Sequence, residues 1–122
     1  MHKTINDITT KKGRQKISVV TSYDYTMTTL CDQVDILLVG DSAGMVMLGY
    51  ENTAPVTMDQ MCMFTEAVSN GRQNALIVAD LPNKSYENEI AAVSNSERLI
   101  NAGADAVKLE GRLPDVIRAI VK

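Results

Sequence analysis

One stretch constrains the fold of this chain more than any other. The apolar run 37–39 ends abruptly in Gly40, Asp41 and Ser42, and a second glycine, Gly44, follows. A continuous apolar run predicts a strand that is covered on both faces, as strands of parallel sheets are. In α/β sheets and barrels, ligands bind just beyond the carboxyl ends of such strands. The stretch therefore predicts a buried parallel strand that delivers an acid and a hydroxyl to a binding edge.

The same arrangement recurs twice further along the chain. A second apolar run ends in Asp80, and a third contains Lys108 and ends in Glu110. The carboxyl ends of neighbouring parallel strands meet at one edge of a sheet. We therefore expect these three side chains to lie close to Asp41.

Expected strands and helices alternate along the whole chain. The strands are predicted at 17–21, 36–39, 75–80 and 106–110, and the helices at 5–12, 24–32, 57–70, 87–102 and from Pro114 onward. Thr57 and Gln60 have the spacing of a capping box, and 43–56 is expected to be a long loop. The layout of 35–41 is echoed weakly at 105–111, which indicates a shared β/α rhythm. The pattern predicts four β/α units around a parallel sheet, with residues 1–122 as a single segment.

The apolar positions of the predicted helices are expected to face the core because they recur at helical spacing. In chain order they are Met27, Leu30 and Cys31; Met58, Met61, Met63, Phe64 and Val68; Ile90, Val93 and Leu99; and Val116, Ile117 and Ile120.

Composition excludes several function classes. The 122 residues are 45% hydrophobic and 22% charged, which is typical of one globular domain. A net charge of −3 without a basic stripe argues against a nucleic-acid partner, and no apolar run approaches the ~18 residues of a membrane span. No signal peptide is apparent. Cys31 and Cys62 have neither metal nor disulfide spacing, so we expect them to be reduced and buried in a cytoplasmic protein, and terminal His2 is assigned no role.

Lys108 and Glu110 are two residues apart on one predicted strand, so they share a face. Val107 and Leu109 point the other way, toward covering helices. Burying a charged pair is costly unless the charges are paired or bind a ligand. One interpretation is a buried Lys108–Glu110 bridge that only stabilises the fold, and the other is a binding site.

The acids favour the binding interpretation because Asp41, Asp80 and Glu110 reach the same edge. Carboxylates and water form a hard oxygen site suited to Mg²⁺, and the absence of Cys and His argues against structural zinc. A divalent ion there would polarise a substrate carbonyl. Lys108 would add positive charge near a developing enolate or a substrate carboxylate, and Ser42 could donate a hydrogen bond to the same oxygen atoms.

Several motifs, taken together, resemble the ketopantoate hydroxymethyltransferase (3-methyl-2-oxobutanoate hydroxymethyltransferase) family. They are TSYDY (21–25), GDSAGM (40–45), PVT (55–57), ADLP (79–82) and GADAVKLEG (103–111), and the resemblance runs in register from about residue 16 to residue 111. It implies an α/β fold, a TIM-type (β/α)₈ barrel of the phosphoenolpyruvate/pyruvate superfamily. This chain would supply about four β/α units, the N-terminal half-barrel.

The resemblance also implies a function. The family transfers a hydroxymethyl group from 5,10-methylenetetrahydrofolate to 3-methyl-2-oxobutanoate, giving 2-dehydropantoate in pantothenate biosynthesis, requires Mg²⁺ and forms homo-oligomers. By resemblance, the metal ligands would be Asp41, Asp80 and Glu110. The ketoacid would contact Asp41, Ser42, Asp80 and Lys108.

Two local departures from the family pattern lie near the site. Asn83 and Lys84 follow Pro82, where the family usually has an aromatic residue, and Gly111-Arg112 replaces a common Gly-Gly.

The larger departure is length, since four β/α units are half a barrel. The family's catalytic glutamate base and a site histidine come from the second half, so we expect no catalytic base within residues 1–122. Tyr23, Asp24 and Tyr25 are the substitutes to consider, beside simple packing or capping roles. Two other functions stay open: a catalytically incomplete fragment that binds metal and ketoacid or assembles with other chains, and another α-ketoacid lyase or mutase of the same superfamily.

Overall fold

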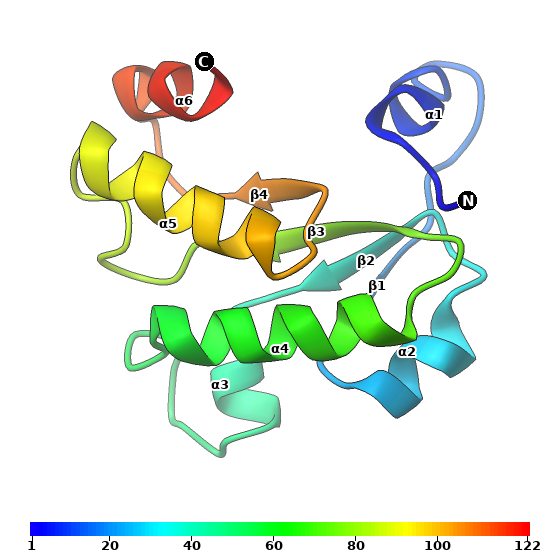
Figure 1. Ribbon diagram of the computed structural model, residues 1–122, viewed down its shortest axis with the longest axis horizontal. Coiled ribbons are helices and arrows are strands. Elements are labelled where there is room, and N and C mark those ends of the chain that lie inside the picture. Colours follow the sequence, from blue (N-terminus) through cyan, green and yellow to red (C-terminus); the bar gives the residue numbers. More distant parts are fainter.

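The computed structural model describes residues 1–122 and is built on a sheet of four parallel strands (Figure 1). The strands are β1 (Val19–Thr21), β2 (Ile36–Val39), β3 (Leu76–Asp80) and β4 (Ala106–Lys108), and they lie side by side in chain order. This confirms the predicted parallel sheet with crossover connections. The fourth strand is shorter than predicted. It ends at Lys108, and Glu110 lies in the loop beyond it.

Six helices connect and flank the strands. They are α1 (Ile5–Thr9), α2 (Tyr25–Cys31), α3 (Ala43–Val46), α4 (Met58–Gly71), α5 (Glu89–Asn101) and α6 (Pro114–Val121). The helix α3 corrects the prediction that 43–56 is a loop throughout. None of the helices combines the length and the hydropathy that a membrane crossing needs.

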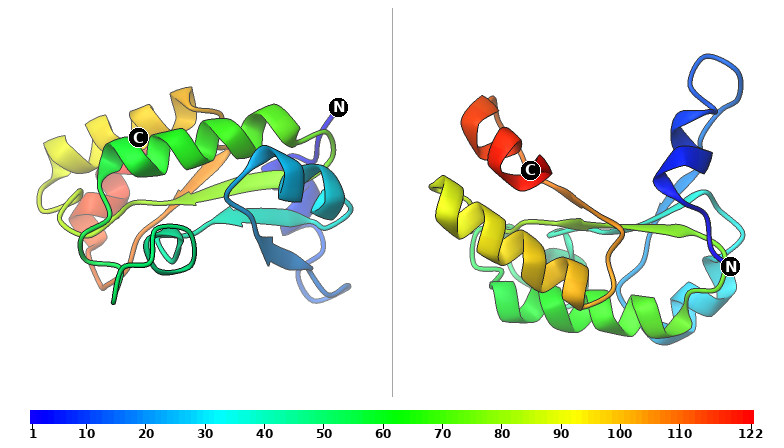
Figure 2. Two further views of the ribbon diagram at one scale, coloured as in Figure 1. Left: turned by 90° about the horizontal axis from the view of Figure 1, so that it is seen from below. Right: turned by 45° about the horizontal axis from the view of Figure 1, so that its top comes forward.

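The helices α4 and α5 cover one face of the sheet, and α2 packs beside α4 (Figure 2). Strand residues of one parity, such as Leu37 and Ile77, are buried on this face in a common cluster with residues of α4. Residues of the other parity, such as Leu38, Val78 and Ala106, are neighbours across the strands and are only half-buried. The sheet is therefore covered on one face and open on the other.

Local hydrogen bonds begin the helices where the sequence predicts them. The Gln60 backbone N–H donates to Thr57 Oγ1 at 3.2 Å, and the Thr57 N–H donates to Gln60 Oε1 at 2.9 Å, which confirms the capping box of α4. Asp24 accepts a hydrogen bond from the Met27 N–H at 2.8 Å and caps α2. This capping role accounts for Asp24 without any part in catalysis.

Half of the predicted core positions of α4 and α5 are confirmed. Met61, Phe64, Val68 and Leu99 are buried in the main apolar cluster, and Val116 of α6 is buried as well.

The predicted inner face of α2 is wrong. Met27 and Leu30 are 47% and 71% exposed, and Cys31 is only half-buried. The buried residue is Thr28, because α2 approaches α4 closely at Gly71, where an added Cβ would lie 3.0 Å from the Thr28 Cβ. A small side chain is required at that contact, so the large apolar residues lie on the opposite face of α2.

Several other positions were predicted as core and are not. Met63, Ile90 and Ile117 are exposed, and Met58, Cys62, Val93 and Ile120 are half-buried. Met58, Cys62 and Ile120 still pack against the main apolar cluster from its edge.

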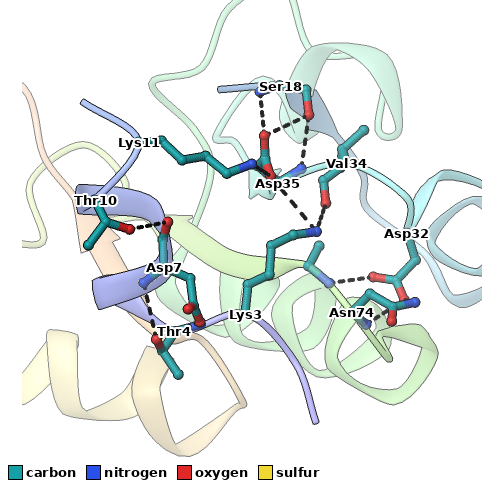
Figure 3. Close-up of polar contacts among 11 residues, drawn as sticks. Lys3, Thr4, Asp7, Thr10, Lys11, Ser18, Asp32, Val34, Asp35 and Asn74 are labelled. Carbon is teal, nitrogen blue, oxygen red and sulfur yellow. Dashed lines mark hydrogen bonds and ion pairs between the residues drawn. The ribbon is translucent and has the colours of Figure 1, made fainter. Parts of the chain in front are cut away.

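The N-terminal segment is attached to the amino ends of the strands through Asp35 (Figure 3). This carboxylate accepts hydrogen bonds from Lys11 Nζ at 2.6 Å and from the Ser18 N–H at 3.0 Å. Lys3 Nζ lies 3.9 Å away and donates to the Val34 carbonyl oxygen at 2.8 Å. The hydrogen bonds from Lys11 and Ser18 lower the pKa of Asp35 to about 2.

Two further aspartates act in the same way at this edge of the sheet. Asp32 accepts hydrogen bonds from three consecutive backbone N–H groups, residues 73–75, at 2.7–2.9 Å. Asp105 accepts from the Ile77 N–H at 2.8 Å and from Arg72 Nη1 at 2.7 Å, and His2 Nε2 lies 3.2 Å from its other oxygen. Asp35 and Asp105 begin the two similar sequence segments 35–41 and 105–111. Asp35 accepts the N–H of Ser18, just before β1, and Asp105 accepts the N–H of Ile77 in β3.

We expect Asp35→Asn to lower the free energy of unfolding by about 1–3 kcal/mol, because it removes the charge that holds Lys11 and Ser18. Urea denaturation at pH 7 measures the change. The folded pKa lies below the ordinary value near 3.9, so the contribution is complete above pH ~4 and is lost as the pH falls toward 2.

The control is Asp115→Asn, since Asp115 is exposed and pairs only with Arg118. The attachment would be contradicted if Asp35→Asn and Asp115→Asn had equal effects at pH 7, or if the loss caused by Asp35→Asn were the same at pH 2.5.

Candidate functional site

The carboxyl ends of β2, β3 and β4 meet at one cavity of about 140 Å³. Asp41, Asp80, Lys108 and Glu110, the four charged residues singled out in the sequence, all line it. The structure therefore brings the predicted charged residues together, as expected for neighbouring parallel strands.

Strand register places Lys108 beside Asp80. These residues are direct partners across β3 and β4, and Lys108 Nζ lies 2.8 Å from Asp80 Oδ1. The Asp80 side chain is 7% exposed and the Lys108 side chain 43% exposed. The first of the two interpretations above, a Lys108–Glu110 bridge, is wrong. The partner of Lys108 is Asp80, and Glu110 lies beyond the end of the strand.

The environment of Lys108 keeps it charged. Partial burial would lower the pKa of Lys108, but the close contact with Asp80 and its negative charge, together with the charges of Glu110 and Asp41, outweigh it and raise the pKa. Lys108 is therefore a fixed positive charge at the wall of the cavity.

Asp80 connects the strand ends, and one of its two carboxylate oxygens accepts no hydrogen bond. Its Oδ2 accepts the Asp41 backbone N–H at 3.1 Å. Its Oδ1 is buried and has the ion pair with Lys108 but no hydrogen bond of good geometry. A buried carboxylate oxygen that accepts no hydrogen bond can still bind a cation or a hydrogen-bond donor of a ligand.

Asp41 is the acid whose ionisation is most opposed by its surroundings. Burial raises the pKa of Asp41, and the negative charges of Asp80 and Glu110 raise it further. Lys108 and a hydrogen bond from the Thr53 side chain act in the opposite direction. Added positive charge at the cavity would relieve this repulsion.

Ser42 lies beside the cavity and not in its wall. Its Oγ is 2.6 Å from the hydroxyl oxygen of Tyr23, in the loop that follows β1. A Cβ built on Gly40 would lie 2.9 Å from Ser42 Oγ and 3.6 Å from Asp80 Oδ2. A side chain at position 40 would therefore displace the Ser42 hydroxyl.

Sequence reasoning missed several residues of the cavity wall. They are Thr53, Ala54, Leu81, Tyr86 and Leu109, and Asn83 was noted only as a departure from the family pattern. The Tyr86 hydroxyl accepts the Glu110 N–H at 3.4 Å, which connects the loops after β3 and β4. Lys84, in the same loop as Tyr86, has φ +64°, a left-handed conformation that favours glycine. Position after the carboxyl ends of β2, β3 and β4 was the available signal for these residues.

The residues present fit a magnesium ion by their chemistry. Carboxylate oxygens are the ligands Mg²⁺ prefers, and the under-bonded Oδ1 of Asp80 lies in a cavity with Asp41 and Glu110. The three carboxylates line the same cavity, but no three His, Cys, Asp or Glu side chains lie close enough to one another to coordinate one metal ion in this structure.

Comparisons with known sequences identify the relatives of this chain. The sequence model of the family described as ketopantoate hydroxymethyltransferase matches residues 2–122. The 3-methyl-2-oxobutanoate hydroxymethyltransferase of Nitrosopumilus maritimus is 65% identical over 99% of this chain and 46% of its own length. That of Cenarchaeum symbiosum is 58% identical over 89% of this chain and 43% of its own. The chain thus spans less than half the length of these curated relatives.

Solved structures confirm the predicted fold class. A 2,3-dimethylmalate lyase of the PEP mutase/isocitrate lyase superfamily matches 99% of this chain and 47% of its own, with a TM-score of 0.71 and 18% identity. An oxaloacetate acetylhydrolase matches 87% of this chain and 42% of its own, with a TM-score of 0.69 and 17% identity. At such low identity the likeness shows the fold alone.

Asp80→Asn removes a negative charge that raises the pKa of Asp41. We expect the pKa of Asp41 to fall toward the ordinary aspartate value near 3.9, and to fall less in Glu110→Gln, whose charge acts more weakly. A pH titration of side-chain carboxyl ¹³C shifts measures both, with Asp115→Asn as the control that leaves Asp41 unchanged. An Asp41 pKa that stays constant or rises in Asp80→Asn would contradict this account of the site.

Proposed function

Because the chain belongs to the ketopantoate hydroxymethyltransferase family, we propose that it forms the metal- and ketoacid-binding half of such an enzyme. The reaction transfers a hydroxymethyl group from 5,10-methylenetetrahydrofolate to 3-methyl-2-oxobutanoate. The observation that carries the proposal is the convergence of Asp41, Asp80 and Lys108 from three successive strand ends on one cavity.

Asp41 and Asp80, with Glu110 as a third ligand, would hold the magnesium ion. The chemistry that a bound Mg²⁺ supplies is polarisation of the ketone oxygen, which acidifies the neighbouring carbon. Lys108 would attract the ketoacid carboxylate and stabilise negative charge on its oxygen atoms, since its pairing with Asp80 fixes its position and its charge.

The charged side chains of the cavity have other roles in this proposal. The raised pKa of Lys108 keeps it protonated, and Asp41, Asp80 and Glu110 are assigned to the metal. Asp24 caps α2, and Tyr25 is 57% exposed on that helix. We therefore place the general base outside residues 1–122, as the family resemblance implies.

Family membership supports three further parts of the proposal: methylenetetrahydrofolate as the co-substrate, a homo-oligomeric assembly and a cytoplasmic location. A lyase acting on another α-ketoacid is the weaker alternative. It rests on solved structures that are only 17–19% identical to this chain, whereas the hydroxymethyltransferases reach 65%.

The first test measures the binding of 3-methyl-2-oxobutanoate by ligand-observed NMR, with and without Mg²⁺. We expect Mg²⁺-dependent binding that Asp80→Asn weakens by about tenfold or more, because the variant loses a charged ligand oxygen. Asp115→Asn is the matched control and should bind like the unaltered chain. Equal binding by Asp80→Asn, or binding independent of Mg²⁺, would contradict the proposal, and a preference for oxaloacetate would favour the lyase.

The second test is deuterium exchange at C3 of the bound ketoacid, measured by proton NMR in D₂O. Exchange requires a base but no folate, so it isolates the first chemical step. We expect no Mg²⁺-dependent exchange above the rate in buffer, since the base lies outside this segment. Rapid exchange that Asp80→Asn abolishes would show instead that residues 1–122 contain a working base.

A further inference from the structure

We propose that Tyr23 is a positioning residue, which orients the Ser42 hydroxyl so that its proton is available to the ketoacid. The inference rests on the proposed function, because Ser42 matters only if a ligand with oxygen acceptors occupies the site. It extends the site to β1, whose end contributes no residue to the cavity wall.

The contact between the two side chains is short and well supported. Tyr23 OH lies 2.6 Å from Ser42 Oγ. The half-buried Tyr23 ring meets the Phe64 ring edge-to-face, with centroids 6.3 Å apart and planes at 74°. Because Phe64 belongs to the buried cluster, the core itself fixes the direction from which Tyr23 approaches the serine.

The Ser42 side chain has no hydrogen-bond partner in its own helix. Ser42 precedes α3, and its side chain makes no capping hydrogen bond there. The only hydrogen bond of its hydroxyl is to Tyr23. The serine hydroxyl is thus held by a residue 19 positions earlier in the chain.

The chemistry of the two hydroxyls favours one direction for the bond. Each can donate one proton, and a phenol O–H is more acidic than an alcohol O–H and is the better donor. When Tyr23 donates, Ser42 Oγ accepts and keeps its own proton for another partner. A Cβ built on Gly40 would contact both Ser42 Oγ and Asp80 Oδ2, so the serine hydroxyl and the acid flank the same glycine at the border of the cavity.

The role predicts a specific dependence between the two residues. We expect Tyr23→Phe to weaken Mg²⁺-dependent binding of 3-methyl-2-oxobutanoate by about threefold to tenfold, the effect of one oriented hydrogen bond. Ser42→Ala should weaken it at least as much. In the Ser42→Ala background, Tyr23→Phe should have no further effect, because there is no hydroxyl left to orient.

The matched control is Tyr50→Phe, which removes a hydroxyl bonded to Gln60 Nε2 at 2.8 Å and outside the cavity wall. It should leave ketoacid binding unchanged. A merely structural role of Tyr23 would appear as a lower melting temperature in Tyr23→Phe with unaltered affinity, and that result would overturn the proposal. Equal weakening by Tyr23→Phe in both serine backgrounds would overturn it as well.

A second readout needs no ligand and separates this inference from the proposed function. The effects of Tyr23→Phe and Ser42→Ala on the unfolding equilibrium should be non-additive if the hydrogen bond exists. Additive effects would overturn the inference whether or not the ketoacid binds. Non-additive effects in a chain that binds no ketoacid would support the hydrogen bond, but overturn the proposed function and with it the role of Tyr23 toward a ligand.

Discussion

The arrangement of the site depends on Asp80, a carboxylate at the end of β3 that is almost fully buried. Its two oxygens reach in different directions, one to the Lys108 ammonium and the other to the backbone N–H of Asp41. A buried charge is tolerated only when such partners compensate it. Because Lys108 ends β4 and Asp41 follows the end of β2, this single side chain fixes the relative positions of three strand ends.

Acidic residues serve opposite purposes at the two ends of the sheet. At the amino ends, Asp32, Asp35 and Asp105 have their hydrogen-bonding capacity taken up by backbone N–H groups and cations. At the carboxyl ends, Asp41 is repelled by its neighbours and Asp80 keeps an oxygen without a good hydrogen bond. The first group stabilises connections between strands, and the second retains unused capacity for a ligand. This division is the one found in α/β barrels, where conserved chemistry lies at the carboxyl ends of the strands.

Sequence reasoning succeeded where a local pattern decides the structure. Buried strands are continuously apolar and a capping box needs only residues 57–60, so the sheet and the start of α4 were predictable. It failed where packing against another element determines which face of a helix is buried. Thr28 of α2 faces inward because Gly71 of α4 allows a close approach, and no pattern within α2 contains that information. Glu110 was placed beside Lys108 by strand alternation, but the strand ends first. The Tyr23–Ser42 contact joins two loops and is equally invisible to periodicity.

The open face of the sheet fits the proposed separation of binding from catalysis. All the charged residues of the cavity lie at the ends of three neighbouring strands, β2 to β4. In the proposed function these residues hold the oxygen atoms of a ketoacid, and the helices α4 and α5 cover only the other face of the sheet (Figure 2). A base has to be within hydrogen-bond reach of the proton that it removes. A base outside residues 1–122 would therefore have to reach the ketoacid from the uncovered side of the sheet.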